Sequence, residues 1–194
     1  MTHSGEARDC QRQIGRSFSS AINATVPLPL RSFIVIAALL CAEIFTLAED
    51  AGNEAAATAL LKKFMATGAD RAALTRELRP TSDDYAKIFT ADFAKKLEAG
   101  QKPLWDSAPV IGPKEGQTEV TVAKATTEDF QKGTAAAKEF PGGYAKLGDK
   151  LQPGATLFRF KFVKPGETLG MAFDGLAFVN GHWRIFPKPW RSAE

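Results

Sequence analysis

Between residues 53 and 100, apolar side chains recur every three or four positions, which is the period of a helix with one buried face. Stop residues divide this stretch into three predicted helices, which end before Gly68, Pro80 and Gly100. The third begins with a capping-box pattern, Thr81 and Asp84, in which aspartate takes the place of glutamate. The expected N-caps of the three helices are Asn53, Asp70 and Thr81. The apolar stripe of the third helix consists of Tyr85, Ile88, Phe89, Phe93 and Leu97.

The pattern weakens between residues 101 and 155. Alternation around Val120 and Val122 predicts a strand, and residues 126–140 are compatible with a short helix. Residues 141–154 are rich in glycine and proline, which favours a surface loop. We therefore expect one strand and one short helix in this region, with the loop outside the core.

Apolar and polar residues alternate again in TLFRFKFVK, residues 156–164. Three phenylalanines alternate with Arg159 and Lys161, which predicts a strand with one buried face and one solvated face. The sequence KPGE that follows is typical of a turn. Pairing of Val163 with Thr168 across this turn would place Phe162, Phe160 and Phe158 opposite Leu169, Met171 and Phe173.

In the next strand the large apolar residues move from odd-numbered to even-numbered positions. Leu176 and Phe178 would therefore fall on the wrong face of a regular strand. A β-bulge, in which one extra residue is inserted at Asp174–Gly175, would return both side chains to the apolar face. Asp-Gly also suits a plain turn. The Asn-Gly pair at 180–181 is the strongest hairpin signal in the chain, and it pairs Phe178 with Trp183. The last forty residues are therefore predicted to form an antiparallel meander.

The first 48 residues differ from the rest of the chain. A polar stretch precedes a wholly apolar run at 33–42. Thr46 and Ala48 then provide the small residues that a signal peptidase recognises before its cleavage site. The run is short for a spanning helix, so we expect cleavage after Ala48 and export of residues 49–194 as a single periplasmic or secreted domain. Because the leader is long, two alternatives stay open: an uncleaved membrane anchor through residues 33–48, or a start codon that lies later than assigned.

Composition narrows the chemistry of the exported part. Both cysteines, Cys10 and Cys41, fall in the leader, which excludes disulfides, thiolate nucleophiles and cysteine metal sites from the domain. A formal net charge of +3 gives no sign of a nucleic-acid partner, and no glycine-rich strand-to-helix turn indicates a nucleotide cofactor. The one histidine of the domain, His182, flanks the hairpin turn, where an exposed side chain is expected rather than a catalytic base. No metal or cofactor is expected.

Two stretches carry a family resemblance. LLKKFMATGADRAALTREL, at 60–78, is similar to the first helix, Gly-Ala-Asp corner and second helix of the nuclear transport factor 2-like superfamily; LAFVNGHWRIF, at 176–186, is similar to its closing hairpin. The chain therefore resembles an exported bacterial member of this group, also called SnoaL-like or cystatin-like cone folds. The resemblance implies an α+β fold in which N-terminal helices pack on a curved antiparallel sheet and leave a conical pocket.

Some members of that group isomerise or dehydrate steroid-like substrates, and others only bind. No catalytic motif of the group can be matched here residue by residue, so we expect a non-enzymatic domain that binds a small apolar molecule or a protein partner, and a homodimer is compatible with this role. The alternative is an isomerase- or dehydratase-type enzyme with Asp174 as base, unless Asp174–Gly175 serves only the backbone. A closed, dry interior would favour binding, and an open pocket with an inward carboxylate would favour the enzyme. The candidate pocket residues are Tyr85, Phe89, Trp105, Phe160, Met171, Asp174 and Trp183.

Overall fold

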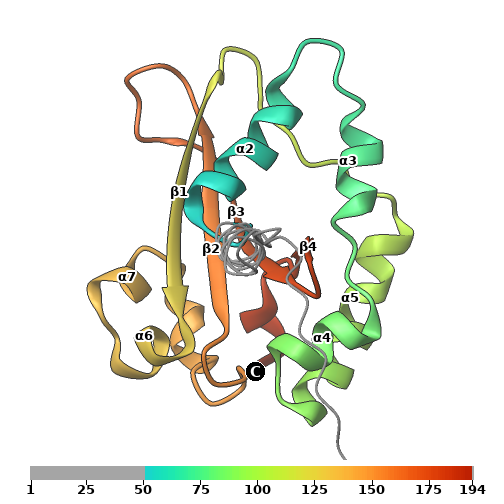
Figure 1. The fold of residues 1–194 in the computed structure, drawn as a ribbon, viewed down its shortest axis with the longest axis vertical. Coiled ribbons are helices and arrows are strands. Elements are labelled where there is room, and N and C mark those ends of the chain that lie inside the picture. Colours follow the sequence, from blue (N-terminus) through green and yellow to red (C-terminus); the bar gives the residue numbers. More distant parts are fainter. Residues whose placement is uncertain (1–50, 194) are drawn as a thin grey trace, which may run out of the picture. The chain divides into compact units, whose positions relative to one another are not determined.

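The computed structural model describes residues 51–193. The predicted leader, its cleavage site and both cysteines lie outside the described residues. Within the described part, helices and a four-stranded antiparallel sheet occur together, which confirms the predicted α+β class (Figure 1). Every helix in this part of the chain is too short or too polar to cross a membrane.

Most of the helical residues precede the sheet (Figure 1). The elements before the first strand are α2 (Glu54–Met65), α3 (Arg71–Glu77), α4 (Ser82–Ile88) and α5 (Ala91–Asp106). The strands are β1 (Glu119–Thr126), β2 (Thr156–Val163), β3 (Gly170–Val179) and β4 (His182–Ile185). Between β1 and β2 lie α6 (Thr127–Lys132), α7 (Ala135–Lys138) and the 3-10 helix η1 (Gly142–Lys146), and the 3-10 helix η2 (Pro189–Ala193) follows β4.

Side-chain caps confirm the three predicted helix starts. The side chains of Asn53 and Asp70 each accept a hydrogen bond at 2.9 Å from a backbone N–H in the first turn of α2 and α3. Thr81 and Asp84 form the predicted capping box at the start of α4, with both reciprocal hydrogen bonds present. These helices therefore begin where short-range hydrogen bonding dictates.

The single helix predicted for residues 81–99 is wrong, because two helices occupy this stretch. α4 ends at Ile88, and Phe89 is extended and forms an isolated antiparallel bridge with Leu151. Thr90 donates its backbone N–H to the Lys150 carbonyl at 2.8 Å. A segment distant in the sequence thus supplies the backbone partners that the broken helix lacks.

Gly100 does not stop α5, which continues to Asp106. Gln101 and Trp105 are buried and continue the inward face of the helix beyond the glycine. Glycine inside a helix costs only about 1 kcal/mol, so this burial outweighs it. The helix ends where Ala108 adopts a positive φ of 51°, directly before a proline.

The sheet is a meander in which β1, β2, β3 and β4 are neighbours in chain order. The register predicted for the β2–β3 turn is wrong by two residues, because Val163 pairs with Gly170 rather than Thr168. Leu169 therefore lies in a longer loop, where it is 81% exposed. A shift of two residues keeps every side chain on its face, so the phenylalanines of β2 are buried as predicted.

The predicted β-bulge in β3 is confirmed. Arg159 pairs with Asp174 and Phe158 pairs with Leu176, which leaves Gly175 as the extra residue. Gly175 has a φ of +85°, a conformation that glycine adopts without the steric cost of a side chain. The bulge returns the apolar residues that follow to the face of the β2 phenylalanines.

The predicted Asn-Gly hairpin is confirmed as well. Asn180 and Gly181 both have positive φ, 51° and 82°, as a type I′ turn requires, and Phe178 pairs with Trp183. The side chain of His182 is 47% exposed beside this turn, in agreement with its predicted exposure.

Both faces of the sheet contribute to the core, which corrects the prediction of one fully solvated face. On the face of the β2 phenylalanines, Leu61 and Phe64 of α2 pack with Trp105 and Ile111 in a first core. The opposite face is solvated only in part, since Arg159 and Lys161 are half-buried. That face contributes to a second core through Ala125, Leu157, Ala177 and Val179.

Residues 141–154 contribute Tyr144, Leu147 and Leu151 to this second core, so the prediction of a loop outside the core is wrong. Tyr144 and Leu147 are at most 1% exposed. A Cβ added at Gly143 would lie 2.6 Å from the ring of Trp190, so this glycine allows the end of the chain to approach. Gly143 therefore serves close packing, although it indicated a loop in the sequence.

Candidate functional site

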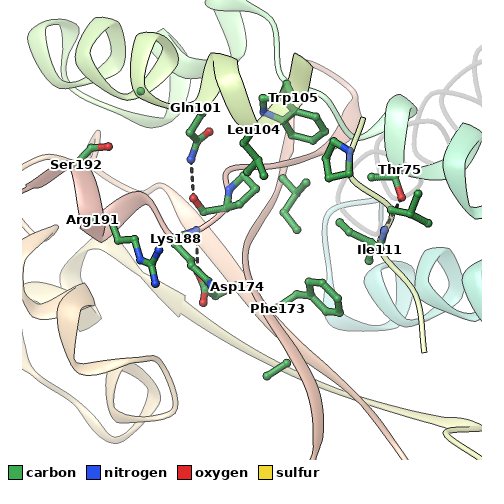
Figure 2. A pocket seen from close by; sticks show the side chains of 16 residues that line it. Thr75, Gln101, Leu104, Trp105, Ile111, Phe173, Asp174, Lys188, Arg191 and Ser192 are labelled. Carbon is green, nitrogen blue, oxygen red and sulfur yellow. Dashed lines mark hydrogen bonds between the residues drawn. The ribbon is translucent and has the colours of Figure 1, made fainter. Parts of the chain in front are cut away.

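A pocket of about 430 Å³ lies between α3, α5, the loop after α5, β3 and the segment after β4 (Figure 2). Its lining is mainly apolar, and pockets of this size and character are where globular proteins hold small molecules. The large apolar side chains of the lining are Leu104, Trp105, Val110, Ile111, Phe173 and Ile185.

Two large apolar side chains of this lining are open to solvent. Leu104 is 40% exposed and Val110 is 59% exposed. Among the described residues, only Leu169 on the β2–β3 turn is another large hydrophobic side chain with such exposure. Because covering exposed aliphatic surface is favourable, an apolar group bound in this pocket would be stabilised.

The loop that carries Val110 is fixed by a buried threonine of α3. Thr75 is 1% exposed, and its Oγ1 accepts a hydrogen bond from the Ile111 backbone N–H at 2.9 Å (Figure 2). The same hydroxyl donates to the Arg71 carbonyl at 2.7 Å. The Thr75 hydroxyl thus acts as both donor and acceptor within the protein, so this wall of the pocket is formed before any ligand binds.

The opposite wall is the segment after β4, which α5 holds in place. Gln101 Nε2 donates to the Pro187 carbonyl at 2.7 Å, and Gln101 Oε1 accepts from the Tyr85 hydroxyl at 2.8 Å. Burial raises the pKa of Tyr85 to about 12, so this hydroxyl keeps its proton at neutral pH. The chain of hydrogen bonds fixes the segment against the helix.

Asp174 lies in the pocket wall at the β3 bulge. Its Oδ1 accepts hydrogen bonds from the Tyr144 hydroxyl at 2.8 Å and from the Lys188 backbone N–H at 3.2 Å. No described residue donates to Oδ2, which leaves this oxygen for a ligand. Burial raises the pKa of Asp174 above its usual range, and the two hydrogen bonds only partly offset that effect.

Two cations lie at the same end of the pocket as Asp174. Lys188 and Arg191 both line it, and the Arg191 guanidinium carbon is 5.4 Å from the ring centroid of Trp190. Neither cation is within ion-pair distance of a carboxylate in residues 51–193. The pocket therefore combines an apolar wall with a positively charged end.

The structure brings two of the seven candidate pocket residues to this site, Trp105 and Asp174. Tyr85, Phe89 and Phe160 are at most 2% exposed and belong to the two cores. The remaining two, Met171 and Trp183, are half-buried and do not line the pocket.

Sequence reasoning missed most of the pocket lining. The residues it did not name include Leu104, Val110, Lys188 and Arg191. One signal was present, because the sequence FPKPWR joins two prolines, two cations and a tryptophan in six residues. These residues fold back onto the domain, and Trp190 packs against the second core.

A second polar cluster lies away from the pocket and ties α4 to the β3–β4 hairpin. Asp84 is 1% exposed and accepts hydrogen bonds from Asn180 Nδ2 at 2.7 Å and Arg184 Nε at 2.9 Å. Burial alone would raise the pKa of Asp84, but donors from Thr81, Arg184 and Asn180 outweigh it and hold the pKa below its usual range. Since every donor comes from the protein itself, we interpret this cluster as structural.

Residues 51–193 hold no group of three or more His, Cys, Asp or Glu side chains arranged to bind a metal ion. The pocket instead offers apolar surface, one carboxylate oxygen and two cations to a ligand. Comparisons of the chain with protein-family models, with curated proteins and with solved structures found no match.

Proposed function

We propose that the domain binds a small, mainly apolar molecule in the pocket between α5, β3 and the segment after β4. The observation that carries this proposal is the exposure of Leu104 and Val110 at a pocket of about 430 Å³. Both walls are held by hydrogen bonds of the protein itself, through Thr75 on one side and Gln101 on the other. A preformed wall lowers the entropy cost of binding, which favours this role.

The wider proposal keeps the resemblance to the nuclear transport factor 2-like group. Helices that precede an antiparallel meander, and a closing hairpin with the Asn180–Gly181 turn, support a cone-like arrangement of that kind. Export to the periplasm or the cell exterior is part of the same proposal and rests on the apolar run at 33–42.

An enzyme is the second candidate, because the pocket is open and Asp174 lies in its wall with a raised pKa. This is the arrangement that would favour a carboxylate base. Among the described residues, the pocket lining holds no second acid and no tyrosine: Tyr85 and Tyr144, the two tyrosines of the chain, do not line it, and the Tyr144 hydroxyl donates its hydrogen bond to Asp174. The pocket therefore lacks the second acid or tyrosine with which enzymes of the resembled group polarise the substrate oxygen, so binding is the better-supported role.

Binding is tested with the neutral fluorescent probe N-phenyl-1-naphthylamine. We expect the wild-type protein to bind it, and Val110→Asp to weaken binding by about tenfold, because a carboxylate at the pocket mouth resists burial against an apolar ligand. The matched control is Leu169→Asp, which places the same charge on an exposed leucine outside the pocket and should leave the affinity unchanged. Equal losses in the two variants would contradict this location, and no binding to wild type would refute the proposal.

The variant Asp174→Asn separates binding from catalysis. We expect its free energy of unfolding at pH 7 to equal or exceed that of wild type, because a desolvated charge is removed while Oδ1 keeps both donors. Binding of N-phenyl-1-naphthylamine should persist. Isomerisation of cyclohex-3-enone to its conjugated form, followed by ultraviolet absorbance, reports a carboxylate base. Acceleration by wild type that Asp174→Asn abolishes would support the enzyme instead.

A further inference from the structure

Two cations are placed at the pocket by a constrained stretch of backbone. Lys188 lies between two prolines and has a φ of +47°, an uncommon value for a residue with a side chain. Its backbone N–H is bound to Asp174, and the carbonyl of Pro187 is bound to Gln101. Both groups belong to the Pro187–Lys188 peptide, so this peptide is fixed at the pocket immediately before the Cα of Lys188, and Arg191 follows one turn later in η2.

The pocket has two chemically different ends. Figure 2 shows Lys188, Arg191 and Ser192 on one side of it and Ile111 on the other, with Leu104 and Phe173 between them. The charged side chains lie at one end only, so an occupant that matches this distribution has one charged end and an apolar body.

The charge of the polar end is not balanced within the pocket. Asp174 is the one acidic residue in the lining, and its Oδ1 accepts from Tyr144 and from a backbone N–H rather than from a cationic side chain. Elsewhere in the described chain, cations such as Arg184 and Lys102 are within 3 Å of a carboxylate oxygen. The pocket cations have no such partner in residues 51–193, and two positive charges face one negative charge.

We propose that the pocket selects an amphipathic organic anion, with its apolar body against Leu104, Val110 and Phe173 and its carboxylate or sulfonate paired with Lys188 and Arg191. This inference rests on the proposed binding function and adds the charge of the ligand. A guanidinium and an ammonium that both contact one oxyanion give charge-assisted hydrogen bonds. Lys188 and Arg191 are both exposed, so this attraction is expected to weaken as salt is added.

A matched pair of probes tests the charge. N-phenyl-1-naphthylamine and 1-anilinonaphthalene-8-sulfonate share one apolar skeleton and differ by the sulfonate. We expect wild type to bind the sulfonate about tenfold more tightly than the neutral probe in fluorescence titrations at low salt. The double variant Lys188→Gln/Arg191→Gln should lose about tenfold in affinity for the sulfonate and less than about twofold for the neutral probe.

The control double variant is Lys62→Gln/Lys63→Gln, which removes the same charge from the exposed surface of α2 and should leave both affinities unchanged. Thermal melts establish that each variant is folded. Equal affinities of wild type for the two probes, or equal losses in the two double variants, would overturn the anion proposal while the binding pocket stands. Failure of both probes to bind wild type would refute the pocket itself, so the two failures are distinguishable.

Discussion

Gly175→Ala is expected to destabilise the domain by about 3 kcal/mol or more. A Cβ added at this position would lie 2.1 Å from the carbonyl oxygen of Phe186, and the φ of +85° is strained for any residue with a side chain. The contact is with backbone, so a change of rotamer cannot relieve it. The Gly175 carbonyl also accepts the Phe186 N–H at 2.8 Å, and this bond would be lost if the strands separate.

A matched control separates the two causes of this loss. Gly166 has a φ of +74° and no heavy atom within 4 Å of its added Cβ, so Gly166→Ala reports the backbone strain alone and should cost about 1 kcal/mol. Urea unfolding followed by circular dichroism measures both variants. Equal losses would show that the approach of Phe186 has no energetic weight.

The same substitution should affect the pocket, because the bulge that contains Gly175 also positions Asp174. Asp174 binds the Lys188 backbone N–H, so displacing the strand from Phe186 also displaces the cationic end of the pocket. Binding of 1-anilinonaphthalene-8-sulfonate should therefore fall in Gly175→Ala even under conditions where the variant is folded, whereas Gly166→Ala should bind as wild type does.

The features predicted correctly from sequence depend on short-range chemistry. The caps at Asn53 and Thr81 act within three residues, the bulge follows from a change of parity inside one strand, and the Asn180–Gly181 turn needs only positive φ at two positions. Each of these is decided by neighbours in the chain, so a single sequence is sufficient to find them.

The features that were missed depend on residues far apart. The break at Phe89 is stabilised by backbone groups near Leu151, and the pocket wall depends on a hydrogen bond from Gln101 to Pro187, which are 86 residues apart. Local propensity contains no information on such pairings. Asp174 could be named a candidate because the bulge marks it, whereas Val110 lies in a loop without any periodic pattern.

Asp84→Ala is expected to cost about 3 to 5 kcal/mol of folding free energy. The carboxylate accepts from Thr81, Asn180 and Arg184, and Arg184 has a side chain only 17% exposed. Its removal leaves a partly buried guanidinium without its anion and removes the acceptor of the Thr81 backbone N–H in the capping box of α4. The control is Asp106→Ala, where the carboxylate is 46% exposed and pairs with Lys102, and the loss should stay within about 0.5 kcal/mol.

The pH dependence provides an independent check on the role of Asp84. Its pKa is lowered in the folded protein, so the folded state binds a proton less readily than the unfolded chain, whose aspartates titrate near pH 4. The stability that Asp84 contributes is fully present above that pH and is lost as the pH falls through the lower, folded value. Asp84→Asn cannot make this transition, so its difference in unfolding free energy from wild type should shrink as the pH falls below about 4.

Asp174 behaves oppositely, because its pKa is raised: its contribution to stability is present below about pH 4 and is lost as the pH rises through the folded pKa. In urea unfolding over a series of pH values, Asp174→Asn should therefore gain on wild type as the pH rises. Parallel pH profiles for the two variants would contradict the assigned environments of both carboxylates.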